Sequence, residues 1–241
     1  MKKFIFGNWK MNMNIEKTKY FFENFVPKNT TAKIVLFVPS TLISQAKGCA
    51  KFPSIEIGAQ NLYYEKSGAY TGEISAEQVL DAGATYVLIG HSERRIIFGE
   101  ESDMISKKLQ AGLAAGLKCV LCVGEALYHR KEGHTKPVLE KELGINLRNI
   151  DKKYYSNIII AYEPVWAIGT GVSAETKDIE EVVEHIIKTA NKITGHTFPV
   201  IYGGSVSGGN AKEIMKLRCL SGVLVGGASL NHQNFDDICE V

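Results

Sequence analysis

The chain has 241 residues, of which 45% are hydrophobic, and this length suits one large domain or two small ones. Its 28 Lys and Arg residues nearly balance its 26 Asp and Glu residues, and no basic block indicates binding to nucleic acid or to a membrane surface. The first apolar run is too short for a signal peptide, and no stretch has the length of a membrane span. Five irregularly spaced cysteines argue against a disulfide framework and fit a reducing compartment. We therefore expect a cytoplasmic protein with one domain over residues 1–241.

Short β-branched runs alternate with longer amphipathic segments along the chain. The apolar runs predict eight strands, at Phe4–Asn8, Ile34–Val38, Ile55–Gln60, Tyr86–Gly90, Lys118–Val123, Ile158–Glu163, Val200–Gly203 and Gly222–Val225. The clearest helical patterns lie at Asp103–Ala115 and Ser173–Thr194, and Ser173 is a good start signal for the second. Because alternating strands and helices form a parallel sheet, the predicted fold class is α/β. Eight units in this length fit a closed (β/α)8 barrel better than an open sheet.

The sixth predicted strand ends in a carboxylate. Ile158–Tyr162 is apolar throughout, and Glu163 follows it directly, at the start of the segment Glu-Pro-Val-Trp-Ala-Ile-Gly-Thr-Gly. Desolvating a charge is costly, so a carboxylate in this position indicates chemistry, although an ion pair with a neighbouring strand would also explain it. Pro164 stiffens the exit from the strand. The small residues after it predict a hinged cover that shields the site from water.

Polar residues concentrate at the carboxyl ends of the predicted strands, where the active site of a barrel lies. The ends carry Asn8, Lys10, His91, Glu93, Glu125, Glu163, Ser205 and Ser229. Taken alone, Lys10 would be a surface lysine, and His91 would be an ordinary core or surface histidine. Their joint occurrence with Glu163 predicts a catalytic rim. Glu93 and Glu125 are expected to be partners of basic groups.

Two glycine pairs follow the last two predicted strands. Gly203-Gly204 and Gly226-Gly227 stand where barrels often bind phosphate on backbone N–H groups. Glycine lets the backbone approach an anion closely because it has no Cβ. One such pair is a common turn feature. The two pairs together predict a phosphate site.

Three other motifs carry little weight. Gly169–Ala174 matches a dinucleotide-binding pattern, but it begins six residues after the strand rather than at its end. Cys119 and Cys122 are spaced like a redox or zinc pair, yet residues three apart on a strand point to opposite faces. The six histidines have no metal-binding helix spacing, so we predict no metal.

The connection Asn61–Glu73 is long for a strand-to-helix loop and carries Tyr63, Tyr64 and Tyr70. Loops of this length are usually functional or disordered. Tyrosines make an interface the favoured interpretation, with a self-packed surface loop as the alternative.

Six motifs in this order together resemble the triosephosphate isomerase family. They are Gly7–Asn12, Gly90–Arg95, Cys122–Glu125, Ala161–Gly171, Tyr202–Ser205 and Val225–Leu230. The resemblance runs from Lys3 to the last predicted helix. It implies a single-domain (β/α)8 TIM barrel that interconverts dihydroxyacetone phosphate and D-glyceraldehyde 3-phosphate through an enediolate. It also implies general acid/base catalysis without cofactor or metal, in glycolysis and gluconeogenesis.

The resemblance implies a role for each rim residue. Glu163 would be the base and His91 the electrophile that moves a proton between the two oxygens. Lys10 would neutralise substrate charge, Asn8 would orient the substrate, and Glu93 would hold Lys10. The implied substrate-binding set is Asn8, Trp9, Lys10, Gly169, Ser205, Gly226 and Gly227.

The resemblance also implies a homodimer. The Asn61–Glu73 loop would insert beside the active site of a second copy, which would put Thr71 near the Asn8 and Lys10 of that copy. Two other classes of protein compete with this interpretation. A barrel lyase or synthase would need a Schiff-base lysine within a strand, and Lys118 starts its strand at the wrong end. A binding protein built on a barrel that has lost its catalytic activity would lack at least one of Lys10, His91 and Glu163, and all three are present.

Overall fold

A computed structural model of the chain describes residues 3–27, 31–167 and 174–240. Eight parallel strands follow one another in sequence order around a closed barrel, in which β8 pairs with β1. The strands are β1 (Phe4–Asn8), β2 (Lys33–Val38), β3 (Ile55–Ala59), β4 (Tyr86–Ile89), β5 (Lys118–Val123), β6 (Ile158–Tyr162), β7 (Val200–Tyr202) and β8 (Gly222–Val225). The predicted (β/α)8 barrel is confirmed, with every strand at its predicted place to within one residue at each end.

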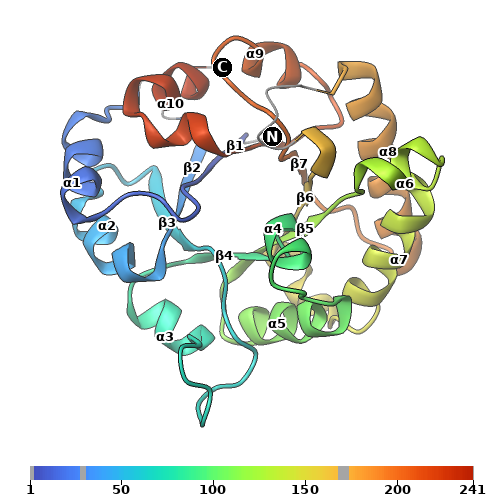
Figure 1. The fold of residues 1–241 in the computed structure, drawn as a ribbon, viewed down its shortest axis with the longest axis horizontal. Coiled ribbons are helices and arrows are strands. Elements are labelled where there is room, and N and C mark those ends of the chain that lie inside the picture. Colours follow the sequence, from blue (N-terminus) through green and yellow to red (C-terminus); the bar gives the residue numbers. More distant parts are fainter. Residues whose placement is uncertain (1–2, 28–30, 168–173, 241) are drawn as a thin grey trace.

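The helices form a ring around the barrel (Figure 1). They are α1 (Ile15–Asn24), α2 (Ile43–Cys49), α3 (Ala76–Asp81), α4 (Ser92–Ile96), α5 (Ser102–Ala114), α6 (Leu127–Lys131), α7 (Thr135–Leu147), α8 (Thr176–Thr194), α9 (Ala211–Ile214) and α10 (His232–Cys239). Short 3-10 turns occur at Ser40–Leu42, Lys152–Asn157, Val165–Ala167 and Gly227–Leu230. None of the helices in the described ranges has both the length and the apolarity to cross a membrane.

Alternate residues of the strands fill two separate cores. The inward-facing residues include Phe6, whose ring lies 5.6 Å from those of both Phe37 and Tyr86. Gly58 makes room for this cluster, because a Cβ at that position would overlap the Phe37 ring. The outward-facing residues pack beneath the helices in a larger core. The barrel is therefore a packed cylinder, and its site can form only at an end.

Helix α8 shows how the outer layer is held. Its apolar face is buried against the barrel and consists of Ile179, Val182, Val183, Ile186 and Ala190. The helix begins at Thr176 after the N-cap Glu175, whose side chain makes no capping hydrogen bond, and it ends at Gly195 in the left-handed conformation (φ 72°). The predicted start at Ser173 lies outside the described residues.

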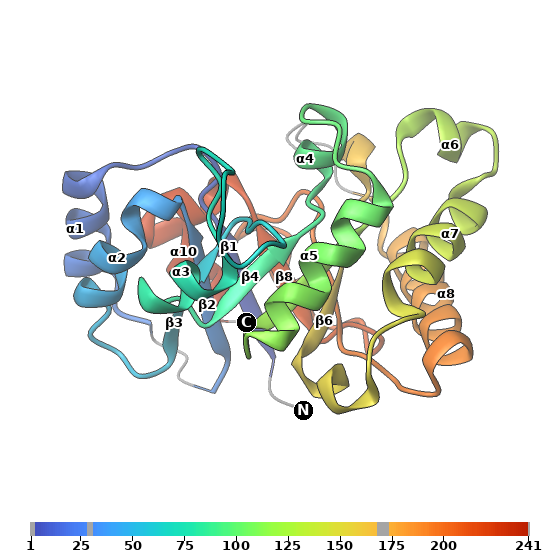
Figure 2. The same ribbon diagram turned by 90° about the horizontal axis from the view of Figure 1, so that it is seen from below.

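The two ends of the barrel differ (Figure 2). Strand β1 starts at the lower end in this view, whereas α4 and α6 lie at the upper end, where the strands finish. The connection 61–73 extends outward beyond the helix ring (Figure 1). Within it, the Tyr63 ring lies 4.3 Å from that of Tyr64 and 4.8 Å from that of Tyr70, although residues 65–73 are exposed.

Candidate active site

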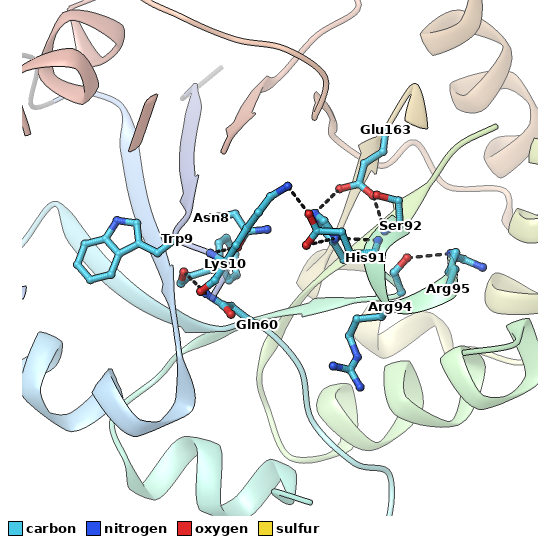
Figure 3. Close-up of polar contacts among 12 residues, drawn as sticks. Asn8, Trp9, Lys10, Gln60, His91, Ser92, Arg94, Arg95 and Glu163 are labelled. Atoms are coloured by element: carbon cyan, nitrogen blue, oxygen red, sulfur yellow. Dashed lines mark hydrogen bonds and ion pairs between the residues drawn. The ribbon is translucent and has the colours of Figure 1, made fainter. Parts of the chain in front are cut away.

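Glu163 and His91 lie next to each other at the upper end of the barrel (Figure 3). The N–H of Glu163 donates to the Val123 carbonyl at 2.8 Å, so the β5–β6 pairing continues for one residue beyond the strand. The Glu163 side chain is only 2% exposed. Its Oε1 lies 3.1 Å from His91 Nε2, and its Oε2 accepts a hydrogen bond of 2.8 Å from the Ser92 N–H. Both carboxylate oxygens are therefore oriented by the turn that follows β4.

His91 is the N-cap of α4, and this position assigns its proton. Its Nδ1 accepts a hydrogen bond of 3.2 Å from the Glu93 N–H. A ring nitrogen that accepts a hydrogen bond carries no proton, so in the neutral imidazole the proton is on Nε2. His91 thus presents an Nε2–H donor beside the Glu163 carboxylate.

Lys10 adopts an unusual backbone conformation, with φ 51° in the left-handed region. Neighbouring side chains hold it there. The Lys10 N–H donates to Asn8 Oδ1 at 3.0 Å, and Gln60 Nε2 donates to the Lys10 carbonyl at 2.9 Å. Non-glycine residues in such strained conformations cluster at functional sites.

The ammonium of Lys10 is also fixed. Its Nζ lies 2.5 Å from Glu93 Oε1, and the two side chains are 25% and 40% exposed. This is the pairing of Lys10 with Glu93 that the family resemblance implies. The Lys10 side chain extends toward His91 across the mouth of the barrel (Figure 3).

A pocket of about 330 Å³ brings these groups and the glycine pairs together. It is lined by Asn8, Lys10, His91, Glu163, Gly203, Gly204, Ser205, Val206, Ser207, Leu224, Gly226, Gly227 and Ala228. The turns after β7 and β8 lie next to the acid/base groups, since a Cβ on Gly203 would be 3.1 Å from Glu163 Cγ and one on Gly226 would be 3.7 Å from Lys10 Cε. Gly169, which belongs to the predicted substrate-binding set, lies outside the described residues.

Of the predicted site residues that the structure describes, Glu93 and Trp9 do not line this pocket. Glu93 borders a neighbouring pocket and holds Lys10, whereas the Trp9 side chain lies in the core. It is fully buried, its indole Nε1–H donates to the Ser229 carbonyl at 3.0 Å, and its ring packs 5.2 Å from that of Phe21 (Figure 3). This side chain ties the turn after β1 to the turn after β8. Its role in the structure is packing between two segments of the rim.

Glu125 is buried beside the segment that follows β6. It accepts hydrogen bonds from the Trp166 indole at 2.9 Å and from the Tyr162 hydroxyl at 3.3 Å. A basic partner was predicted for Glu125, and Arg130 Nη1 lies 4.0 Å from Glu125 Oε1. The Arg130 guanidinium also lies over the Trp166 ring. Burial raises the pKa of Glu125, although these hydrogen bonds and Arg130 oppose the rise. Glu125 thus anchors Trp166, three residues after Glu163.

Three contributors to the site were not predicted from the sequence. Gln60 supports Lys10, the Ser92 N–H orients Glu163, and the Arg95 guanidinium donates to the carbonyls of Gly90 and Cys122 at 2.8 and 2.9 Å. Gln60 binds a backbone carbonyl and Ser92 acts through its own backbone N–H, so neither residue type indicates the contact in the sequence. Arg95 follows His91 in the same motif, and its position on α4 was the available clue.

Cys119 and Cys122 face opposite sides of β5, as predicted. Cys119 belongs to the outer core and Cys122 to the barrel interior. Burial, and then the charge of Glu163, raises the pKa of the Cys122 thiol, which therefore stays protonated. Within the three described ranges, no group of three or more His, Cys, Asp or Glu side chains could hold a metal ion.

The geometry also bears on the competing interpretations. The strand lysines, Lys33 and Lys118, start β2 and β5 at the end of the barrel opposite the pocket. No strand lysine can therefore form a Schiff base in the pocket. Lys10, His91 and Glu163 line one cavity. A barrel that had lost its catalytic activity would not preserve this arrangement.

A carboxylate, an imidazole and an ammonium group line one small pocket together with the glycine turns after β7 and β8. This arrangement on a (β/α)8 barrel defines an enzyme that transfers protons on a small anionic substrate. The comparisons with known proteins are more specific. A family model described as triosephosphate isomerase matches residues 3–241, and the chain belongs to this family.

Individual relatives agree over their whole length. The chain is 44% identical over 245 residues to the triosephosphate isomerase of Lawsonia intracellularis, with 98% of this chain and 96% of the relative covered. It is 40% identical over 240 residues to that of Alkaliphilus metalliredigens, with 97% of each covered. A crystal structure of the enzyme from Bartonella henselae has a TM-score of 0.89 and 36% identity, and covers 100% of this chain and 98% of that one.

Proposed function

We propose that this chain interconverts dihydroxyacetone phosphate and D-glyceraldehyde 3-phosphate through an enediolate, with no cofactor. One observation carries the proposal: Glu163 Oε1 lies 3.1 Å from His91 Nε2 in a pocket that Lys10 also lines. A base, a proton donor to oxygen and a cation are the groups that this isomerisation needs. Membership of the triosephosphate isomerase family supports the same reaction.

Glu163 is the base. It removes a proton from the carbon beside the substrate carbonyl, and it later returns a proton to the carbon that was the carbonyl carbon. The carbonyl oxygen of a bound substrate accepts a hydrogen bond from the Nε2–H of His91, and Glu163 Oε1, which has no hydrogen-bond partner among the described residues, faces the carbon. His91 then donates this proton to one enediolate oxygen and takes a proton from the other. No proton is gained or lost over the cycle.

Lys10 stabilises the negative charge that develops on the enediolate, because an ammonium group that is already fixed in place needs no reorganisation during the reaction. Asn8, which holds the Lys10 backbone, orients the same oxygens. The phosphate binds on N–H groups of Ser205, Gly226 and Gly227, and of Gly169 in the predicted set. The absence of side chains at the glycines admits the anion at close range. Trp9 serves by packing rather than by contact with the substrate.

A coupled assay tests this proposal. Purified protein is given glyceraldehyde 3-phosphate, and the dihydroxyacetone phosphate formed is reduced by an added dehydrogenase. The matched control is Glu163→Gln, which keeps the shape of the side chain but removes the base. We expect rapid turnover by the wild-type protein and almost none by the variant. A folded wild-type protein without turnover would refute the proposal.

The 61–73 loop is the proposed contact of a homodimer. A second pocket of about 400 Å³ adjoins the catalytic groups and is bordered by Met11, Glu73 and Phe98 as well as by Lys10 and Glu93. Met11 is 96% exposed and Phe98 is 66% exposed. Apolar side chains exposed to this degree around a groove favour a protein partner. The loop of a second copy, with Thr71 directed at Asn8 and Lys10, is the proposed occupant.

Sedimentation equilibrium tests the dimer. Phe98→Glu places a charge in the proposed interface and is expected to give monomers with reduced activity. Val26→Glu, which changes another exposed apolar residue (57% exposed), is the control and should remain dimeric. A monomeric wild-type protein at micromolar concentration would contradict the assignment.

We also propose a cytoplasmic location, which is supported by five cysteines that are all free.

A further inference from the structure

A half-buried carboxylate outside the proposed reaction, that of Glu142, borders the same cavity as Glu163. Glu142 is on α7, on the face that carries the buried residues Leu139 and Leu143 toward the barrel. Its side chain is 13% exposed. Burial raises the pKa of Glu142 and the charge of Arg95 opposes the rise. A carboxylate in such a position is costly unless its oxygens are used.

Both oxygens of Glu142 are used, and both contacts lead to the ends of strands that carry the site. Oε2 accepts a hydrogen bond of 3.1 Å from the N–H of Gly124, the residue after β5. Oε1 lies 3.3 Å from Arg95 Nη1. The same guanidinium donates to the Gly90 carbonyl, next to His91, at 2.8 Å and to the Cys122 carbonyl at 2.9 Å. Glu142 and Arg95 therefore link α7 to the exits of β4 and β5.

Gly124 transmits this link to Glu163. The backbone on either side of it pairs with the segment after β6: the Glu163 N–H donates to Val123 and the Val165 N–H donates to Glu125. Gly124 itself lies so close to Glu163 that a Cβ would overlap the Glu163 carbonyl oxygen. A shift of Gly124 must therefore move the Glu163 backbone.

A cavity of about 200 Å³ makes this restraint necessary. It lies on the side of Glu163 away from Lys10, and its lining includes Ser92, Arg95, Gly124, Glu142 and Glu163. Figure 3 shows Arg95 on that same side of the site. Empty space behind a catalytic carboxylate permits it to relax away from the substrate, because no packed atoms oppose the movement.

We infer that Glu142 is a positioning residue, which holds Glu163 against His91 by accepting the hydrogen bond from Gly124 while Arg95 orients its carboxylate. The inference rests on the proposed function, since it concerns the reach of the proposed base. The operative contact is the acceptor oxygen for the Gly124 N–H. Misplacement of a reacting group by about 1 Å can cost ~10²-fold in rate.

Three variants test this role in the coupled assay, with kcat expressed per folded protein. Glu142→Ala removes the acceptor and is expected to lower kcat at least about tenfold while KM changes little, because Glu142 does not line the pocket formed by the glycine turns that bind the phosphate. Glu142→Gln keeps one acceptor oxygen of the same shape and should restore most of the lost kcat. Glu140→Ala, on the same helix but with a 57% exposed side chain, is the matched control and should keep the wild-type kcat.

The outcomes separate this role from simple stabilisation and from the proposed function itself. A structural contribution alone would lower the melting temperature of Glu142→Ala but leave kcat per folded molecule unchanged, and that result overturns the inference. Equal losses of kcat in Glu142→Ala and Glu142→Gln overturn it as well. If Glu142→Ala fails to fold, Glu142→Thr replaces it, because threonine has a hydroxyl acceptor on a shorter side chain. Its kcat is expected to lie below that of Glu142→Gln and above that expected for Glu142→Ala. Inactive wild-type protein would instead refute the proposed function.

Discussion

His91 and Glu163 meet across β5, which separates the strands that carry them. The meeting is possible because Gly124, at the end of β5, has no side chain where a Cβ would overlap the Glu163 carbonyl. The Glu163 carboxylate can then reach the turn after β4, where Ser92 N–H and His91 Nε2 approach it at 2.8 and 3.1 Å. The relationship between the base and the imidazole thus depends on the strand between them.

Glu163→Asp tests the required reach of the base. The substitution withdraws the carboxylate by about one methylene, so we expect kcat to fall by ~10²-fold or more, since proton transfer depends steeply on distance. Circular dichroism should show an unchanged fold. Steady-state kinetics that give the wild-type kcat would remove Glu163 from the role of base.

Lys10→Ala tests the electrostatic role of the ammonium group. We expect a loss of activity of about 10²-fold or more, because removal of one preorganised charge stabiliser has an effect of this size. The partner variant Glu93→Gln should have a smaller effect, because it frees the ammonium from its 2.5 Å contact but leaves the charge in the pocket. Comparison of kcat/KM for both variants and the double variant measures the coupling. A fully active Lys10→Ala protein would contradict the assignment.

Gly58→Ala tests the packing of the barrel interior. The added methyl group would overlap the Phe37 ring, so we expect a loss of about 1–3 kcal/mol in the free energy of unfolding. Phe37→Leu in the same chain removes the overlap and should recover part of the loss. Denaturant unfolding of the two single variants and the double variant gives the coupling energy. Additive losses would show that the two sites are not in contact.

Glu56→Gln tests an ion pair at the lower end of the barrel. Burial raises the pKa of Glu56, but hydrogen bonds from Lys33 and Thr85 outweigh it and the net pKa is lowered. A lowered pKa in the folded state means that the carboxylate stabilises the fold above its ordinary pKa of 4.5, and that this stabilisation is lost as the pH falls through the folded pKa.

Glu56→Gln should therefore be destabilised by about 1–3 kcal/mol at pH 7, and by progressively less as the pH falls below the ordinary pKa of 4.5. Unfolding by urea across the pH range measures the difference. Glu180→Gln, at an exposed position of α8, should match the wild-type protein throughout. A difference between Glu56→Gln and wild type that does not change with pH would contradict the ionic contribution.

The sequence predicted the strands and the rim because both depend on local patterns. Uniform β-branched runs such as Ile158–Tyr162 mark strands buried on both faces, and their carboxyl ends must meet once the barrel closes. Other features depend on contacts that are distant in the sequence. The left-handed conformation of Lys10 is held by Gln60, and Glu142 contacts Gly124 from a helix. No periodicity indicates such pairings.

The rim motifs predicted which residues lie at the site better than they predicted the directions in which the side chains point. Asn8 and Lys10 face the pocket as expected, whereas Trp9, between them, turns into the core beneath α1. Residues that follow a strand in a tight turn do not keep the alternation of the strand, so their directions follow only from the three-dimensional packing.

The most direct test of the central claim is isomerisation in deuterium oxide, followed by mass spectrometry of the product. If a carboxylate of the protein removes a carbon-bound proton and an enediolate intervenes, glyceraldehyde 3-phosphate formed from dihydroxyacetone phosphate acquires solvent deuterium at carbon 2. A product formed at full rate that carries at carbon 2, in every molecule, the hydrogen lost from carbon 1 would contradict the account, since it would mean direct transfer between the carbons with no proton on Glu163 that exchanges with solvent.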